Sequence, residues 1–442
     1  MNKLISNQTP DKEYTTKKKI ENILFFILLA SGLLIFFYYV YILTRFECGK
    51  LGYTLCAAIG EDFFHLYQAG YNFVHGYYVY GSGASEHLVT PFFMQNRYFP
   101  AMFIFFGWPF LVFPSVITAY YVYLFIAITI HFSGLWLIWL IYKKFKTNKI
   151  ILGLACLFWL GYFPLNSEWR MGQFNDISAV FFFAAITAII YKKKILGPFL
   201  WIISLAWKPL PLFGLPFFVK TKSKSLLILF FAFFVLLTII YVGFFQIYQN
   251  SAISDFLSKM ISSQNDIGFQ VHYIDNFGIF SLIGELFYDN SITLYNTFCT
   301  VFTIFLFALY GFMFMAANVK DESAKLYYLL FSTSTLLVYH KLVWESVLCF
   351  WLPIIITLLL IAKYKREKIF ILVCGAILGT PSLFYFQQIY GNEFWRFILI
   401  AEKALPQLAL YLYLVFKCFK FIESQKHKKL SDSDKTVAPI IV

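Results

Sequence analysis

Charged residues are scarce in this chain of 442 residues, since only 13% of them are Asp, Glu, Lys or Arg. A water-soluble protein of this length needs considerably more charge to cover its surface. Hydrophobic residues make up 60% of the sequence and aromatic residues 22%. This composition excludes a soluble globular protein and predicts an integral membrane protein.

Cysteine patterns typical of disulfide frameworks and zinc sites are also missing. The seven cysteines are spread singly, with no CxxC pair and no zinc-ligand spacing. No fixed-period repeat is visible, and no polar stretch is long enough to form a separate soluble domain. We therefore expect no cofactor, although a divalent metal is compatible with the sequence.

Long apolar blocks account for the hydrophobic content. Spanning a bilayer takes about 20 residues as a helix. Blocks of that length are Ile23–Leu43, Ser225–Tyr248, Leu294–Ala317 and Ile369–Tyr390. Backbone groups in lipid must be satisfied within the segment, and these blocks are too long for barrel strands. The sequence therefore predicts an all-α polytopic transmembrane protein with about 11 to 13 membrane helices.

Lysine and arginine produce a net charge of +13, and their positions indicate topology. Most lie in clusters beside apolar blocks, at 1–19, 143–149, 192–194, 220–224, 320–325, 363–368 and from 417 onward. The positive-inside rule places these clusters in the cytoplasm, so they point to a plasma-membrane protein and not to nucleic acid. We expect a cytoplasmic N-terminus over 1–22, a transmembrane domain with a retained signal anchor over 23–421, and a disordered cytoplasmic tail over 422–442.

The segment after the first outer loop, 44–97, leaves two topologies open. It contains a short apolar block, Tyr98–Phe113, and a long one, Val116–Tyr142. Two full crossings would leave the basic run at 143–149 outside, against the charge rule. Either the short block is re-entrant, or this loop is an exception to the rule.

Polar residues gather in the segments that this topology places outside the cytoplasm. Ionisable groups near the ends of membrane helices usually face a cavity or a partner. The set comprises Glu61, Asp62, His65, Tyr67, Glu168, Arg170, Gln173, Asn175, Asp176, Lys208, His272, Asp275, Asn276, His340, Lys341, Trp344 and Glu345. Any catalysis or binding is therefore expected on the outer face.

Several of these residues also have an ordinary structural interpretation. The Glu61-Asp62 pair could form an acidic cap for a helix predicted over Phe63–Val74. Arg170 could form an ion pair with Glu168 or Asp176, and His340 could be a buried core histidine. These alternatives stay open at the level of single residues.

Lys208 lies within Ile195–Val219, an apolar stretch that begins and ends beside basic clusters. Its ammonium could reach the membrane interface by snorkelling. Pro209, Pro211 and Pro216 disrupt any continuous helix here and predict a hairpin of two short helices that lines a cavity.

The order of six segments is more specific than any one of them. They are GEDFFHLYQAGYNFVHGYYVYG at 60–81, NRYFPAMFIFFGWPFLVFP at 96–114, WRMGQFNDISAVFF at 169–182, SLAWKPLPLFGLPFFVKTKSK at 204–224, DNFGIFSLIGELF at 275–287 and LVWESVLCFWLPIII at 342–356. In this order the chain resembles glycosyltransferase family 87, within the GT-C superfamily. The shared pattern is an Asp-Phe followed by a Tyr and a G-x-x-x-Y, then Tyr-x-Pro, G-Q-x-N and Lys-Pro.

The resemblance implies an inverting transfer of a hexose, typically mannose, from a polyprenyl-phosphate donor to a glycan or glycolipid acceptor outside the cytoplasm. It makes Asp62 the general base, with Glu61 able to share or take that role. Gln173, Asn175 and Lys208 match its other motifs. The last outer loop reads WES where relatives often carry Trp followed by His, so His340 is a loose substitute.

Inverting transfer needs a carboxylate to take a proton from the acceptor hydroxyl and a cation to stabilise the leaving phosphate. Arg170 and Lys208 are the first candidates for that cation, with Lys341 and His340 behind them. The other substrate-binding candidates are His65, Tyr67, Gln173, Asn175, Asn276, Trp344 and Glu345. Two alternatives are a transporter or flippase of lipid-linked sugars, suggested by the proline-broken helices, and a glycan polymerase or ligase.

Overall fold

The computed structural model describes residues 10–45, 59–80, 87–91, 102, 106–220, 276–288, 291–317, 322–381 and 393–436, with a few single residues between 228 and 258. Within these ranges every regular element is helical and none is a strand. The prediction of an all-α polytopic membrane protein is confirmed. The block Ser225–Tyr248 lies largely outside the described residues, so the total of 11 to 13 membrane helices stays a prediction.

Five helical segments are long and apolar enough to cross a membrane. They lie in α1 (Pro10–Arg45), α5 (Val116–Phe145), α6 (Lys149–Gly161) continued by α7 (Pro164–Met171), α16 (Ile292–Ala316) and α20 (Glu393–Thr436). The shorter elements are α3 (Glu61–Val74), η2 (Trp108–Val112), α8 (Asn175–Ile190), α9 (Leu196–Trp207), η3 (Leu210–Gly214), α10 (Leu215–Lys220), α15 (Ile279–Phe287), α17 (Glu322–Tyr339), η5 (Glu345–Phe350), α18 (Trp351–Ile361) and α19 (Lys365–Gly379).

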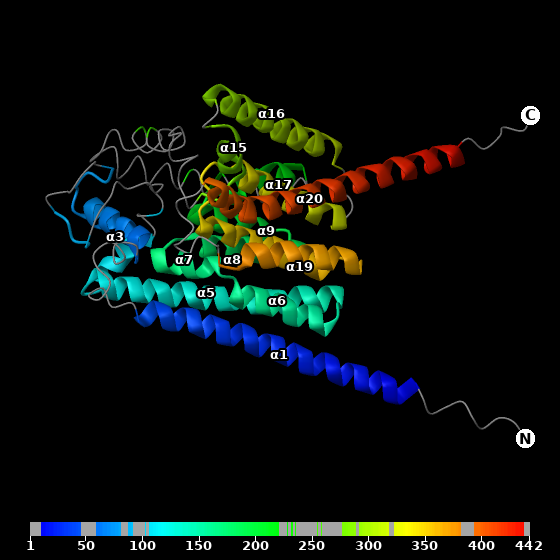
Figure 1. Cartoon of the computed structure of the whole chain (residues 1–442), viewed down its shortest axis with the longest axis horizontal. Helices are drawn as coiled ribbons and strands as arrows, with labels where there is room; N and C mark the ends of the chain where they lie inside the picture. Colours follow the sequence, from blue (N-terminus) through cyan, green and yellow to red (C-terminus); the bar gives the residue numbers. More distant parts are fainter. Residues whose placement is uncertain are drawn as a thin grey trace, which may run out of the picture.

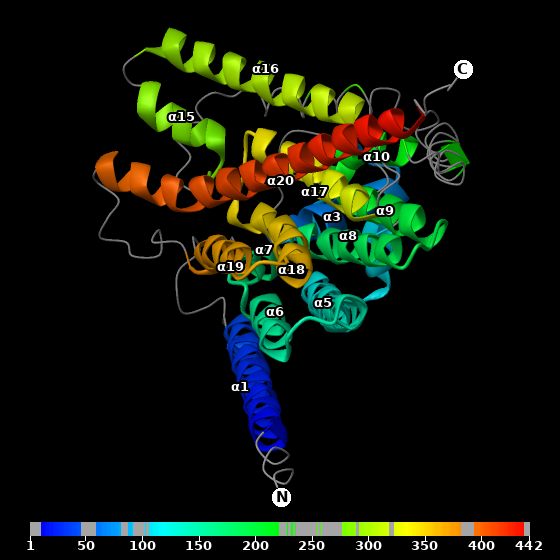
Figure 2. The same cartoon turned by 90° about the vertical axis from the view of Figure 1, so that its right-hand side faces the viewer.

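The helices form one bundle in which α1 and α16 lie at opposite edges (Figure 2). The middle of the bundle is apolar, and residues 351–360 of α18 are all buried. The chain enters α1 and leaves α20 at the same end of the bundle, whereas α3 lies at the opposite end (Figure 1). We call the end with α3 the α3 end and the other the terminal end.

The basic run at 143–149 lies beside the first part of α1. Asn148 donates a hydrogen bond to the Glu21 carboxylate at 3.1 Å, and Lys149 donates to the Asn22 side chain at 2.5 Å. The N-terminal part of α1 and the α5–α6 loop therefore occupy the same end of the bundle. This agrees with the expectation that both basic segments face the same side of the membrane.

The described part of the short apolar block contains no spanning helix. Its regular element, η2, has five residues and packs against α3. Gly70 permits this contact, because a Cβ atom there would lie 2.5 Å from the Trp108 amide nitrogen. Between residues 59 and 145, α5 is the only described segment long enough to cross the membrane. The choice between the two topologies stays a prediction, because most of residues 98–105 lie outside the described residues.

The predicted hairpin over Ile195–Val219 is confirmed. Helix α9 ends at Trp207, and Lys208 has an extended backbone with φ −150° and ψ 136°. Pro209 then precedes η3 and α10. Because a residue before proline is disfavoured in the helical region, the chain breaks at Lys208.

Two helices extend into the segments expected to flank the membrane domain. Helix α1 begins at Pro10, within the segment expected to precede the membrane domain. Helix α20 continues to Thr436, within the segment expected to form the cytoplasmic tail. Extending an existing helix adds one hydrogen bond per residue without a new nucleation cost, so polar residues can continue it.

Candidate functional site

The turn between α7 and α8 brings the polar residues of the G-Q-x-N motif together. Helix α7 ends at Gly172, whose φ of +69° is in the left-handed region. The Gly172 amide donates to the Trp169 carbonyl at 3.1 Å, and the Gln173 amide donates to the Glu168 carbonyl at 2.9 Å. This Schellman ending reverses the chain sharply and starts α8 at Asn175.

Glu168 fixes the start of α8 from the preceding helix. Its carboxylate accepts hydrogen bonds from the Asp176 backbone amide and from the Asn175 side chain, each at 2.9 Å. The Glu168 side chain is fully buried. A buried carboxyl acceptor at a helix N-terminus satisfies amide hydrogens that have no partner within the helix.

Two tyrosines of α5 hold the same turn through its backbone. The Tyr120 hydroxyl donates to the Trp169 carbonyl at 2.7 Å, and the Tyr123 hydroxyl donates to the Gln173 carbonyl. Both rings are buried. The turn is thus fixed from α5, α7 and α8 together.

Helix α3 docks on this turn and presents Glu61 and Asp62 to it. The Gly60 amide donates to the Arg170 carbonyl at 2.7 Å. Gly60 is the N-cap of α3 and has a φ of +70°. The predicted helix therefore exists, but it starts at Glu61, so both carboxylates lie in its first turn, where they complement the helix dipole.

We expect Gly172→Ala to destabilise the protein and to displace Asp62. A Cβ atom at Gly172 would lie 2.7 Å from Phe63 Cβ, and the left-handed backbone costs a non-glycine residue about 1–2 kcal/mol. Thermal unfolding of detergent-solubilised protein, followed by tryptophan fluorescence, measures the loss. Gly311→Ala is the matched control, because nothing lies within 4 Å of its Cβ position. Equal midpoints for both variants would contradict this prediction.

The side chain of Gln173 connects Asp62 with Lys208. Its Nε2 donates to Asp62 Oδ2, and its Oε1 accepts from Lys208 Nζ at 3.2 Å. Asn175 Nδ2 also approaches Gln173 Oε1, at 3.4 Å. A carboxylate only accepts and an ammonium only donates, so this orientation of the amide is the one that satisfies both. All of Asp62, Gln173 and Lys208 are half-buried.

Burial lowers the pKa of the Lys208 ammonium, while the carboxylates of Asp62 and Glu168 act in the opposite direction. Lys208 therefore lies close enough to both carboxyl groups for them to influence its ammonium. A half-buried lysine in this setting remains suited to meeting an additional anion.

Asp176 belongs to a closed buried network. Its carboxylate accepts from His131 Nδ1 at 2.9 Å and from Trp169 Nε1 at 3.2 Å, and it is 2% exposed. His131 Nε2 lies 2.9 Å from the Trp159 carbonyl. These bonds join α5, α6, α7 and α8 below the turn, so Asp176 supports the site from within the core.

Arg170 forms no ion pair with Glu168 or Asp176 in the part of the chain that the structure describes. The ion pair considered from the sequence is therefore not formed there. Arg170 lies in the last turn of α7 and is half-buried, and its own carbonyl accepts the Gly60 amide that docks α3. Its guanidinium is a second cation at the α3 end.

His340 lies near Lys208, just beyond the end of α17. Its Nδ1 accepts from the Leu342 amide at 3.2 Å, which leaves the ring proton on Nε2. Burial, and then the Lys208 ammonium, lower the pKa of His340 to about 4. With this pKa the imidazole is an uncharged N–H donor at neutral pH.

Asn276 anchors the segment that follows His340. Its Nδ2 donates to the Lys341 carbonyl at 2.7 Å, and its Oδ1 accepts from the Val343 amide at 2.9 Å. The Phe277 amide donates to the Val343 carbonyl at 2.8 Å. Asn276 is fully buried, so it positions this segment.

We expect Asn276→Ala to lower the free energy of unfolding by about 3 kcal/mol, because burying an unpaired donor or acceptor costs about 1–3 kcal/mol. The Val343 amide and the Lys341 carbonyl would each lose a partner. Denaturation in detergent measures the change. Thr129→Ala removes only an exposed bond to the Phe125 carbonyl and should stay within about 0.5 kcal/mol of the unmodified protein. A similarly small change in Asn276→Ala would refute this role.

The remaining candidates differ in burial. His65, Tyr67, Asn175 and Glu345 are buried, while Glu61, Lys341 and Trp344 are half-buried. Burial raises the pKa of the Tyr67 hydroxyl. His272 and Asp275 lie outside the described residues. No three His, Cys, Asp or Glu side chains among the described residues are placed to hold a metal ion.

The sequence analysis did not identify Gln68 and Gln407, two buried amides that fix segments around the site. Gln68 is fully buried, and its amide contacts the His87 carbonyl at 3.1 Å and the Val89 amide at 2.9 Å. Gln407 of α20 donates to the Phe277 carbonyl at 3.0 Å and accepts from Trp351 Nε1 at 3.0 Å. An amide side chain on the apolar part of a helix was the available signal for each.

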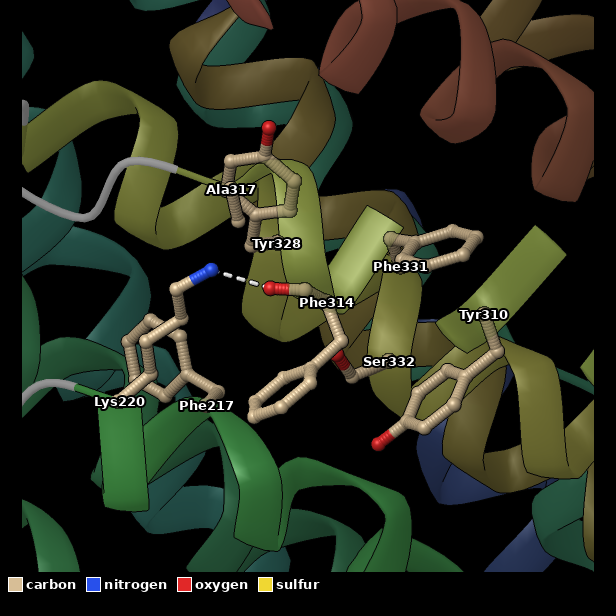
Figure 3. A pocket seen from close by; sticks show the side chains of 8 residues that line it. All are labelled: Phe217, Lys220, Tyr310, Phe314, Ala317, Tyr328, Phe331 and Ser332. Atoms are coloured by element: carbon tan, nitrogen blue, oxygen red, sulfur yellow. Dashed lines mark hydrogen bonds between the residues drawn. The ribbon is translucent and has the colours of Figure 1, made fainter. Parts of the chain in front are cut away.

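A small cavity between α10, α16 and α17 has no residue in common with this network (Figure 3). The cavity is lined by eight residues, among them Lys220, Tyr310, Phe314 and Tyr328. The Phe314 carbonyl accepts a hydrogen bond from Lys220. Its volume of about 10 Å³ is close to the least that holds one water molecule. It is therefore too small for a sugar.

Comparison with known proteins gives one match. Residues 98–339 match the model of glycosyltransferase family 87. No curated protein and no solved structure matches the chain. The matched range includes Arg170, Gln173, Asn175, Lys208 and Asn276, and it leaves out Glu61, Asp62 and the segment from His340 onward.

Proposed function

The chain belongs to glycosyltransferase family 87, and from this membership we propose that it transfers one hexose from a polyprenyl-phosphate donor to a glycan or glycolipid acceptor. The transfer inverts the anomeric carbon. We propose mannose as the hexose, because the ordered motifs resemble those of glycosyltransferase family 87, for which mannose is typical.

The main support for the proposal is the pair of hydrogen bonds that joins Asp62 to Gln173 and Gln173 to Lys208. A carboxylate and an ammonium lie at the two ends of one amide side chain. Inverting transfer needs these two charges on opposite sides of the reacting carbon, one facing the acceptor and one facing the donor phosphate. Gln173 contacts both groups, which supports a site that holds a base and a cation together.

Asp62 serves as the general base in this proposal. The acceptor oxygen attacks the anomeric carbon as its proton passes to an Asp62 carboxylate oxygen. A positioned base of this kind contributes roughly 10²–10⁴-fold in rate. The Gln173 amide holds Asp62 Oδ2 and thereby orients the carboxylate.

The bond between the anomeric carbon and the phosphate oxygen breaks in the same step, and the electron pair stays on the polyprenyl phosphate. Because phosphate is a good leaving group, no second carboxylic acid is required, in contrast to glycosidases. Growing negative charge on the phosphate is stabilised by Lys208 and Arg170, with the neutral His340 imidazole as a further donor. Lys341 lies on the same segment as His340 and adds positive charge there.

We place the reaction on the extracytoplasmic face of the plasma membrane. The support is the position of α3 at the end of the bundle opposite the termini (Figure 1) and the lysine-rich loop at 143–149 beside residues 21–22 of α1. A basic terminal end is typical of the cytoplasmic side. Both termini are then cytoplasmic.

Incubation of the purified protein in lipid nanodiscs with radiolabelled polyprenyl-phosphate mannose, and membrane glycolipids as acceptors, tests the function. We expect label in a product that is heavier by a single hexose in mass spectrometry, with an inverted anomeric configuration. Polyprenyl-phosphate glucose tests the choice of sugar. A product heavier by an oligosaccharide would indicate a polymerase or ligase, and label from a nucleotide sugar alone would refute the proposed donor.

A further inference from the structure

We propose that four stacked rings at the C-terminal end of α3 bind a sugar ring of the acceptor glycan, a role that rests on the function proposed above. The rings belong to Tyr71, His75, Tyr77 and His87, and we call them the ring platform. Asp62 lies in the first turn of α3, whereas the ring platform begins in its last turn. The two parts of one helix would then contact different parts of the same acceptor.

The ring platform consists of two stacked pairs that lie close together. The His75 and Tyr71 rings stack with their centroids 4.0 Å apart, and the His87 and Tyr77 rings stack at 4.1 Å. The planes of His75 and Tyr77 differ by only 12°, with centroids 5.9 Å apart. Both tyrosines are half-buried and both histidines are exposed. The surface that a ligand can reach is therefore formed mainly by two imidazoles.

Such a surface fits one face of a hexose. A pyranose presents several C–H groups on one face and hydroxyl groups around its rim, and C–H groups are attracted to the electron-rich face of an aromatic ring. The Tyr71 carbonyl only accepts, so His75 Nδ1, 2.8 Å away, donates to it. In the neutral imidazole Nε2 is then a hydrogen-bond acceptor. The ring platform thus offers ring faces to the C–H groups of a sugar and a ring nitrogen to one of its hydroxyl groups.

Buried amides hold the two chain segments that carry the rings. The fully buried Gln68 contacts the His87 carbonyl at 3.1 Å and the Val89 amide at 2.9 Å. It also donates to Asn72 Oδ1 at 2.8 Å, and Asn72 Nδ2 donates to the Tyr78 carbonyl at 3.2 Å. The rings are therefore in position before a ligand arrives, which lowers the entropic cost of binding.

The composition of the ring platform favours a polar ligand over lipid. Trp and Tyr supply the aromatic belts that anchor proteins at membrane interfaces. In the ring platform the exposed members are instead His75 and His87, whose rings each carry two polar nitrogens. Helix α3 also lies at the end of the bundle opposite the termini (Figure 1). These features point to a sugar in the aqueous phase.

The distance from Asp62 defines the class of acceptor. From Asp62 to His75 the helix rises about 20 Å, at 1.5 Å per residue. A single sugar ring is much shorter than this distance. The ring platform therefore binds a sugar that lies several residues away from the hydroxyl that receives the hexose, so the acceptor is an oligosaccharide chain.

Transfer to manno-oligosaccharides of one to five sugars, in nanodiscs with saturating donor, tests this inference. In the unmodified protein, KM for the acceptor should fall about tenfold once the chain is long enough to reach the ring platform. His75→Ala should cancel this gain, so that KM for the long acceptors rises about tenfold. His75→Phe keeps a ring and should retain part of the gain. A KM that does not depend on length, or an equal gain in His75→Ala, would overturn the proposal.

Val74→Ala is the matched control. Val74 precedes His75, is 55% exposed and has no ring, so its substitution removes apolar surface beside the ring platform. Its length dependence should equal that of the unmodified protein. Loss of the gain in both Val74→Ala and His75→Ala would indicate a general apolar contact, as with lipid, and would contradict a ring platform.

Saturation-transfer NMR with mannopentaose and no donor measures binding without catalysis. The C–H protons of the sugar should receive saturation from the unmodified protein, and less of it from His75→Ala. Equal saturation from both proteins would also overturn the ring platform. If the unmodified protein bound the pentaose in this way but transferred no hexose, the proposed function would fail and the ring platform would stand.

Discussion

We expect Asp62→Asn to lower the rate of hexosyl transfer by roughly 10²–10⁴-fold, the usual contribution of a positioned general base. Asparagine has nearly the same shape and can still accept the hydrogen bond that Gln173 donates. It cannot take up a proton from the acceptor hydroxyl. Initial rates in nanodiscs with saturating donor and acceptor measure the loss in kcat, and donor binding should change little.

Glu61→Gln separates the two neighbouring carboxylates. Both lie in the first turn of α3, so both substitutions remove one charge from the same helix end. If Asp62 is the base, Glu61→Gln should retain most of the activity. Full activity in Asp62→Asn together with loss in Glu61→Gln would move the general base to Glu61.

We expect Lys208→Met to lower kcat by roughly 10²–10³-fold, the usual effect of removing one group that stabilises charge in a transition state. Methionine keeps most of the apolar length of the side chain but has no charge to meet the leaving phosphate. Lys208→Arg should retain more activity, because it preserves the charge. Single-turnover kinetics with labelled donor separate the chemical step from donor binding.

Lys193→Met is the control for the general loss of one positive charge. Lys193 is exposed and follows the end of α8 remote from Asn175. The Lys193→Met substitution should leave the rate of hexosyl transfer unchanged. Equal rates for Lys208→Met and the unmodified protein would show that Arg170 or the His340 segment carries the phosphate charge instead.

The helical fold class and the grouping of polar residues in the outer segments could be predicted from the sequence, for physical reasons. Apolar block length determines spanning helices, and the prolines after Lys208 dictate the break that the structure has there. The G-Q-x-N segment forms the turn between α7 and α8 and ends on the first residue of α8. These features depend on residues close together in the chain.

The contacts that complete the site depend on distant residues and were not predictable in this way. The sequence offered Glu168 as a partner for Arg170, whereas its carboxylate caps α8. Asn276 looked like a ligand for substrate, whereas its amide joins two backbone segments 65 residues apart. Buried backbone groups need hydrogen-bond partners, and Glu168 and Asn276 supply them. Which backbone groups are buried is known only when the positions of the helices are known.

Helix α1 packs chiefly along α6 and has no comparable contact with α5, the next membrane-spanning helix. The pair is close-fitting, since a Cβ atom at Gly32 would lie 3.1 Å from Leu157 Cα and one at Gly153 would lie 3.0 Å from the Leu28 side chain. Ribosomes add about 5–20 residues per second. Helix α1 is therefore synthesised several seconds before α6, and its glycine-lined face has to wait that long for the helix that covers it.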